Sequence, residues 1–178
     1  MSGRTDIHVV VLAGRDVNPL LARWLRPWPY VEIWPGADCR HDIPKVRNDI
    51  FRWFRDEALR PWLLMLDDDV VPVAQTAPLL ACEADVASPR IAAAGGREAH
   101  PHTLSAAAVK VSRRAVERIP EPWFRWPKRG CECSFFFSKA YTHGFRPAKA
   151  GAIGHRFPVT VLPGRRFLFD REVPCAPL

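Results

Sequence analysis

The sequence WLLMLDDDVVP, residues 62–72, runs from bulky apolar residues directly into three carboxylates and then returns to apolar residues. The apolar run has the composition of a buried strand. Neighbouring carboxylates repel one another, and burying any of them without a partner costs free energy. The three acids therefore either protrude from a turn into water or are held together by a cation.

The segments on both sides of this stretch alternate between strand and helix patterns. Strands are expected at residues 6–14, 30–36, 62–72, 85–91 and 103–112, with a short strand leading to His155. Helices are expected at residues 18–28, 43–60, 76–84, 113–119 and 131–144. Such alternation predicts an α/β sheet with helices on both faces. A chain of 178 residues suits one domain, so we expect a single domain over residues 1–178.

The composition is that of an ordinary globular protein, with 48% hydrophobic and 25% charged residues, and this excludes a disordered chain. The net charge of +7 favours an anionic partner, which leaves nucleic acid, a phosphorylated ligand and an acidic membrane face open. The cationic residues are scattered, which weakens the nucleic-acid interpretation. No apolar segment reaches the length that crosses a bilayer, so no transmembrane segment is expected.

The five cysteines match no common metal or redox motif. They are Cys39, Cys82, Cys131, Cys133 and Cys175. Their spacing fits neither a zinc knuckle nor a thioredoxin motif, and Cys131 and Cys133 are too close for an ordinary disulfide. We expect reduced thiols in a cytoplasmic protein.

The carboxylates at the end of the buried strand are the first candidate site, because ligands in α/β folds bind at the carboxyl ends of strands. Asp67 and Asp69 are two residues apart, so in an extended segment they point the same way and Asp68 points oppositely. Two convergent oxygen donors suit Mg²⁺ or Mn²⁺ bound together with substrate phosphates. An acidic turn without a metal is the alternative.

The order of motifs along the chain resembles that of GT-A fold glycosyltransferases, most closely the family 2 type. LLMLDDDVVP is similar to the strand, acid-x-acid and proline of that family, and VVVLAGRD to its first strand and nucleotide-contacting loop. IPKVRNDIF resembles the helix that carries an Arg-Asn pair, and SRRAVERI the helix after the acceptor-side strand. GCECSFFFSKAYTHGFRPAKAGAIGH is similar to the Glu-Asp helix, strand and closing histidine. The resemblance covers residues 6–157, leaves a tail at 158–178, and implies a near-minimal, Rossmann-like GT-A domain with a mixed, mostly parallel sheet.

The resemblance also implies an activity, the transfer of a sugar from a UDP- or GDP-linked donor to an acceptor hydroxyl, with inversion. Asp69 would coordinate Mn²⁺ or Mg²⁺, with His155 as a further ligand and Asp67 on the ribose or the metal. The residues implied to contact the nucleotide or donor are Arg15, Asp38, Lys45, Arg47, Asn48, Asp67 and Asp68. A solvated helix face is the alternative for Lys45 and Arg47.

Glu132 occupies the position of the general base in inverting members, which deprotonates the acceptor hydroxyl. The family usually has two acids here, whereas this chain has Cys131-Glu132. An acid stabilised by the helix dipole is the alternative. Trp123, Phe124 and Trp126 in the preceding loop would stack on acceptor sugar rings, or else complete the hydrophobic core.

Other functions stay open. A basic nucleic-acid-binding module is one, although the adjacent acids speak against it and we expect no nucleic-acid partner. A nucleotidyltransferase would carry a glycine-rich loop where LAGRDVNPL has one glycine. A degenerate protein that binds a nucleotide sugar without turnover is the third. The acceptor is unknown, and its site is either open or completed by a partner subunit or a second copy.

Overall fold

The computed structural model describes residues 4–14, 16–35, 39–92, 104–155, 158–159 and 168–169. The strands are β1 (Ile7–Ala13), β2 (Val31–Pro35), β3 (Trp62–Asp67), β4 (Val70–Pro72), β5 (Val86–Ala92), β6 (Ala108–Ser112), β7 (Ala148–His155), β8 (Pro158–Val159) and β9 (Leu168–Phe169). The helices are α1 (Pro19–Leu25), α2 (Cys39–Asp56), α3 (Ala77–Ala81), α4 (Arg113–Arg118) and α5 (Glu132–Thr142), with 3-10 turns η1 (Arg4–Asp6) and η2 (Ala74–Thr76). The predicted alternation of strands and helices is confirmed.

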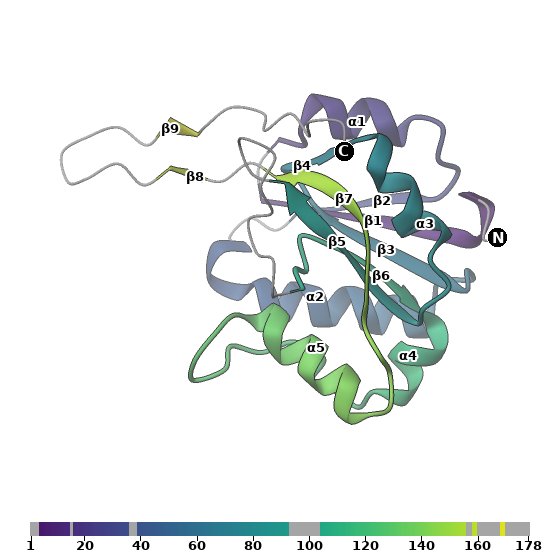
Figure 1. Ribbon diagram of the computed structural model, residues 1–178, viewed down its shortest axis with the longest axis vertical. Coiled ribbons are helices and arrows are strands. Elements are labelled where there is room, and N and C mark those ends of the chain that lie inside the picture. Colours follow the sequence, from purple (N-terminus) through teal and green to yellow (C-terminus); the bar gives the residue numbers. More distant parts are fainter. Residues whose placement is uncertain are drawn as a thin grey trace.

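The described residues form a seven-stranded mixed sheet in the order β2-β1-β3-β6-β5-β7-β4 (Figure 1). Strands β2, β1 and β3 are parallel, and β6 runs antiparallel to both β3 and β5. Strand β7 is parallel to β5, and β4 is antiparallel to β7. The α/β class and the mixed sheet are confirmed, and within this seven-stranded sheet parallel and antiparallel pairs are equally frequent.

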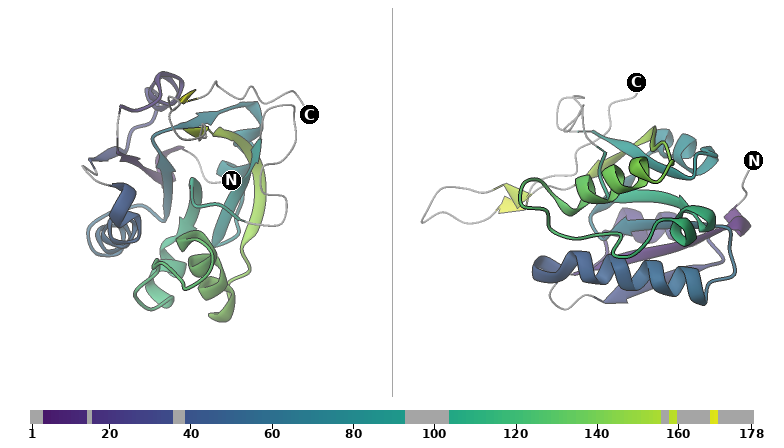
Figure 2. Two further views of the ribbon diagram at one scale, coloured as in Figure 1. Left: turned by 90° about the vertical axis from the view of Figure 1, so that its left-hand side faces the viewer. Right: turned by 90° about the horizontal axis from the view of Figure 1, so that it is seen from below.

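Helices cover both faces of this sheet, α2, α4 and α5 on one side and α1 and α3 on the other (Figures 1 and 2). Alternate side chains of strand β1 pack into the cores on opposite faces of the sheet. Val10 and Leu12 belong to the core beneath α2, α4 and α5. Ile7, Val9 and Val11 belong to the core beneath α1 and α3. A strand that is covered on both faces buries side chains on both sides, which is why β1 is apolar at every position except His8.

The long helix predicted at residues 43–60 is present as α2, but it begins and ends earlier. Its apolar face buries Ile50, Phe51 and Phe54 completely. Leu59, which was expected on that face, lies beyond the helix and is 90% exposed, so that expectation was wrong. Within the described ranges, no helix combines the length and the apolar character that a membrane-spanning helix requires.

The stretch at 62–72 contains two strands, whereas the sequence predicted one. Strand β3 ends at Asp67, a turn follows, and β4 begins at Val70. Strand β4 then pairs with β7 at the opposite edge of the sheet. The acidic residues therefore mark the place where the chain leaves the centre of the sheet and crosses to its edge.

Candidate functional site

Asp67, Asp69 and His155 meet at the end of β3. The pairing of β4 with β7 explains why, since it places His155 directly opposite Val70, the residue after Asp69. His155 Nε2 lies 3.1 Å from Asp69 Oδ1, and one ligand atom from each of the three side chains lies within 4.8 Å of the others. The structure thus brings together the three residues that were predicted as metal ligands.

The acids converge through a turn, whereas we had expected an extended segment. Asp67 is the last residue of β3, and Asp68 and Asp69 form the turn. The Asp68 carboxylate accepts a hydrogen bond of 3.0 Å from the backbone N–H of Gly14, at the end of β1. Its carbonyl accepts another, of 2.8 Å, from the N–H of Asn18. Asp68 therefore ties the turn to the segment that follows β1, while its two neighbours approach His155.

Arg47 lies directly behind these acids and is buried, with a side chain that is 3% exposed. Its Nη2 donates to both carboxylate oxygens of Asp67 at 2.9 and 3.3 Å, and its Nη1 donates to the carbonyl of Ala106 at 2.8 Å. Its Nε lies 3.7 Å from Glu132 Oε1. Arg47 was predicted near a nucleotide, and the structure places it as the cation that joins two carboxylates.

The carboxyl group of Asp67 has a perturbed pKa. Burial raises the pKa of Asp67 to about 6, against the opposing effect of the nearby Arg47 and His155. A cation bound at this point would favour the ionised form, because an opposite charge lowers the pKa of a carboxyl group.

The donor set of this cluster fits a divalent metal. Two carboxylates and one imidazole suit Mn²⁺, whereas Mg²⁺ prefers oxygen ligands throughout. The side chains of Asp67, Asp69 and His155 are 26%, 11% and 16% exposed, so all three are partly accessible to a ligand. The residues at this point are therefore compatible with the metal that the sequence predicted.

Glu132 begins α5 between two thiols. Its side chain is 7% exposed and accepts a hydrogen bond of 3.3 Å from Cys133 Sγ. Cys131, the N-terminal cap of the helix, is exposed. Contact with Cys133 lowers the pKa of the Cys131 thiol to about 5, and the same contact together with burial raises the pKa of Cys133. The predicted base therefore contacts a cation on one side and a thiol on the other.

Asn48 has a role that the sequence did not indicate. Its Oδ1 accepts hydrogen bonds from the backbone N–H groups of Trp123 and Phe124 at 2.9 and 3.0 Å. Its Nδ2 donates to the carbonyl of Phe124 at 2.8 Å. Both aromatic side chains are buried in the core, which agrees with the alternative given for them, whereas Trp126 is 52% exposed. No local pattern reveals such a contact, because it joins segments far apart in the chain.

The remaining predicted nucleotide contacts are less informative. Lys45 is 67% exposed and pairs with Asp49, one turn along α2, at 3.3 Å. That geometry is typical of a solvated helix face. Arg15 and Asp38 lie outside the residues that the structure describes, so their roles stay predictions.

Comparison with known proteins identifies the fold. No protein-family model and no curated protein sequence matches this chain. Among solved structures, A197 from STIV is similar over 93% of this chain and 94% of its own, with a TM-score of 0.63 and 16% identity. A glycosyltransferase involved in glycosylation of the major capsid of PBCV-1 matches over 81% of each chain, with a TM-score of 0.52 and 14% identity.

A third similar structure is a Drosophila β-1,4-galactosyltransferase 7 mutant in complex with manganese, UDP-Gal and xylobiose. It matches over 81% of this chain and 64% of its own, with a TM-score of 0.55 and 14% identity. The chain has the GT-A fold. Identities this low establish the GT-A fold alone, so the closer likeness to family 2 stays a prediction. Within the GT-A fold, Asp67 and Asp69 lie at the carboxyl end of a central strand, where such sheets bind ligands.

Proposed function

We propose that the protein is a metal-dependent glycosyltransferase that moves a sugar from a nucleotide-diphosphate sugar to an acceptor hydroxyl. The observation that carries the proposal is the convergence of Asp67, Asp69 and His155 at the end of β3 in a GT-A fold. Two of the similar structures are glycosyltransferases, and one of these was solved with manganese and UDP-Gal. These likenesses support the proposed donor class and metal.

In the proposed site, Asp69 and His155 hold Mn²⁺ or Mg²⁺, with Asp67 as a third ligand or a contact to the ribose. The ion, when bound, offsets the negative charge that builds on the departing diphosphate. Arg47 donates to both oxygens of Asp67 and so fixes the orientation of that carboxylate. Asp68 fixes the turn through the Gly14 N–H. The proposed contacts to the nucleotide are Arg15, Asp38 and Lys45.

Glu132 is the proposed general base. It takes the proton of the acceptor hydroxyl while that oxygen attacks the anomeric carbon, and direct displacement of this kind inverts the anomeric centre. Arg47 and the first turn of α5 offset the cost of burying its charge. Trp126, exposed in the loop before α5, is the proposed acceptor contact, because aromatic faces pack well against sugar rings.

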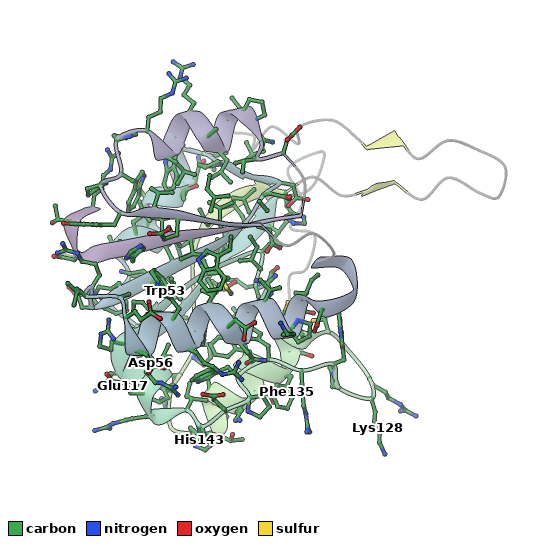
Figure 3. All side chains as sticks on the ribbon, turned by 180° about the vertical axis from the view of Figure 1, so that it is seen from behind. Trp53, Asp56, Glu117, Lys128, Phe135 and His143 are labelled. Atoms are coloured by element: carbon green, nitrogen blue, oxygen red, sulfur yellow. The ribbon has the colours of Figure 1, made fainter. Side chains whose placement is uncertain are left out.

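The experiment is a screen of UDP- and GDP-linked sugars with Mn²⁺, in which donor binding and release of the nucleoside diphosphate, with water or an added sugar as the acceptor, are measured for the native protein, Asp69→Asn and Glu132→Gln. We expect metal-dependent release by the native protein and none by Asp69→Asn. Glu132→Gln should keep donor binding and lose about 10²–10⁴-fold in transfer rate, the usual contribution of a general base. The exposed Asp56, at the end of α2 (Figure 3), provides a control through Asp56→Asn.

The outcomes separate the alternatives. Donor binding without release by the native protein would indicate a nucleotide-sugar-binding protein that lacks turnover. Absence of both binding and release, for every donor and either metal, would contradict the proposal. Where transfer is found, the anomeric configuration of the product, read by nuclear magnetic resonance, tests inversion.

A further inference from the structure

Two thiols and a carboxylate meet at the start of α5. One ligand atom from each of Cys131, Glu132 and Cys133 lies within 4.8 Å of the others. Residues two apart within a helix point in different directions. Cys131 and Cys133 nevertheless converge, because Cys131 precedes the helix and has extended backbone angles, φ −106° and ψ 166°. The direction of its side chain is therefore not set by the helical geometry.

We propose that Cys131, Glu132 and Cys133 form a second metal site, which takes a thiophilic divalent ion such as Zn²⁺. Thiolate sulfur and carboxylate oxygen are both ordinary zinc ligands, and three protein ligands leave a further coordination position for water. The Asp67, Asp69 and His155 cluster contains no sulfur, and its oxygen-rich donors suit Mn²⁺ instead. The two sites therefore differ in the softness of their donor atoms.

A divalent ion offsets most of the negative charge of the proposed site. Two thiolates and the Glu132 carboxylate together carry three negative charges when the site is filled, and the ion provides two positive charges. Arg47, whose Nε lies 3.7 Å from Glu132 Oε1 and whose Nη2 donates to Asp67, is shared between the two carboxylates and offsets part of the remainder. A thiol binds as its thiolate, so Cys133, whose pKa is raised by its contact with Cys131 and by burial, gives its proton to the buffer on binding.

The site is accessible and its backbone is held in place. Cys131 is exposed, which gives an ion a route from solvent, while Cys133 is half-buried and Glu132 is buried. The hydroxyl of Ser134 donates a 2.7 Å hydrogen bond to the carbonyl of Cys131 and so fixes the turn into α5. The three ligand atoms are therefore close together before an ion arrives, which lowers the ordering cost of binding.

The site itself does not depend on the proposed function, but one consequence does. Within the proposed reaction, an ion on Glu132 competes with the acceptor proton for the same carboxylate. Zn²⁺ is therefore expected to inhibit transfer in the presence of saturating Mn²⁺. Failure of this inhibition with intact Zn²⁺ binding would count against Glu132 as the base and would leave the metal site in place.

The first test titrates Co²⁺, an optical stand-in for Zn²⁺, into the reduced, metal-free protein and follows thiolate-to-metal charge-transfer absorbance. We expect a saturating thiolate band that Zn²⁺ abolishes by displacement. The band should be lost in the Cys131→Ser/Cys133→Ser double variant and kept in Cys82→Ser, which removes a half-buried thiol elsewhere. Asp69→Asn should also keep the band. Absence of a thiolate band in the native protein, or its persistence in the double variant, would overturn the proposal.

A second test uses the native protein and so does not depend on whether the double variant folds. Iodoacetamide labelling of each cysteine is followed by mass spectrometry with and without Zn²⁺. At a Zn²⁺ concentration ten times the dissociation constant, labelling of Cys131 should slow by about tenfold, because the free fraction falls by that factor. Cys82 should be labelled at an unchanged rate, and Mg²⁺ should protect neither. Equal protection of Cys131 and Cys82 by Zn²⁺, or protection of neither, would contradict the proposed site.

Discussion

Arg47 and Glu132 form a buried ion pair in which Nε lies 3.7 Å from Oε1, and both side chains are at most 7% exposed. The same guanidinium donates to Asp67 at 2.9 Å. One buried cation therefore contacts both the proposed metal site and the proposed base, and it holds the start of α5 against the end of β3.

Replacement of Arg47 by methionine should destabilise the fold strongly. Arg47→Met leaves the buried Glu132 and the partly buried Asp67 without their cation, and removal of one partner of a buried pair costs about 3–5 kcal/mol. The free energy of unfolding in urea measures this. Arg52→Met, on the exposed side of α2, is the matched control and should cost at most about 1 kcal/mol. Equal costs would show that Arg47 does not have the proposed role.

Asn48→Ala should loosen the loop before α5. The change leaves the backbone N–H groups of Trp123 and Phe124 without their acceptor, at about 1–3 kcal/mol for each buried group. Amide hydrogen exchange should accelerate at Trp123 and Phe124 in particular. Lys45→Ala, an exposed substitution on the same helix, should stay within about 0.5 kcal/mol and leave exchange unchanged. Unchanged exchange in Asn48→Ala would argue against this role.

Gly151→Ala and Gly144→Ala form a matched pair. Both glycines have positive φ, 69° and 83°, so each substitution brings backbone strain of about 1–2 kcal/mol. A Cβ on Gly151 would in addition lie 2.4 Å from the carbonyl oxygen of Gln75, whereas a Cβ on Gly144 meets nothing within 4 Å. Thermal unfolding should therefore show a clearly larger loss for Gly151→Ala. Similar losses would mean that β7 and η2 separate easily.

The buried His8 should make stability depend on pH. Burial lowers the pKa of His8 below its usual value, against the opposing effect of Glu32, while Arg60 lowers it further. The unfolded chain then binds more protons, so His8 makes stability fall as the pH falls from about 6.5 to the lowered folded pKa. The raised pKa of Asp67 changes stability with pH in the opposite direction. This effect is the same in the native protein and in a variant at His8, so the difference between the two reports His8.

His8→Phe should keep the contact with Trp53, which lies between α2 and the sheet (Figure 3), and remove the titration. Urea unfolding from pH 7 down to about pH 5 should give a shallower loss of stability on acidification in His8→Phe than in the native protein. Parallel curves would show that His8 does not titrate in this range.

The sequence predicted the features that depend on local pattern. The apolar run before Asp67 predicted β3, and the helical spacing of Ile50, Phe51 and Phe54 predicted α2. The position of His155 beside Asp69 was predicted only through resemblance, because it depends on the pairing of β4 with a strand far along the chain.

The burial of Arg47 and the contacts of Asn48 could not be predicted in the same way. A polar residue on a helix is ordinarily solvated, and only the arrangement of α5 and the loop before it encloses these two side chains. A strand that ends in charged residues and two strands joined by a charged turn have similar sequence patterns. The sequence therefore did not distinguish one strand at residues 62–72 from two strands joined by the turn at Asp68.

In the proposed function, Asp67, Asp69 and His155 bind a nucleoside diphosphate through a divalent metal. Calorimetric titration of UDP and GDP, with and without Mn²⁺, into the native protein and Asp69→Asn tests this binding. We predict that one nucleotide binds only with Mn²⁺ and that Asp69→Asn abolishes this binding while folding normally. Binding that is independent of Mn²⁺ and unchanged in Asp69→Asn, or no binding of either nucleotide, would contradict a metal-dependent nucleotide site at these residues.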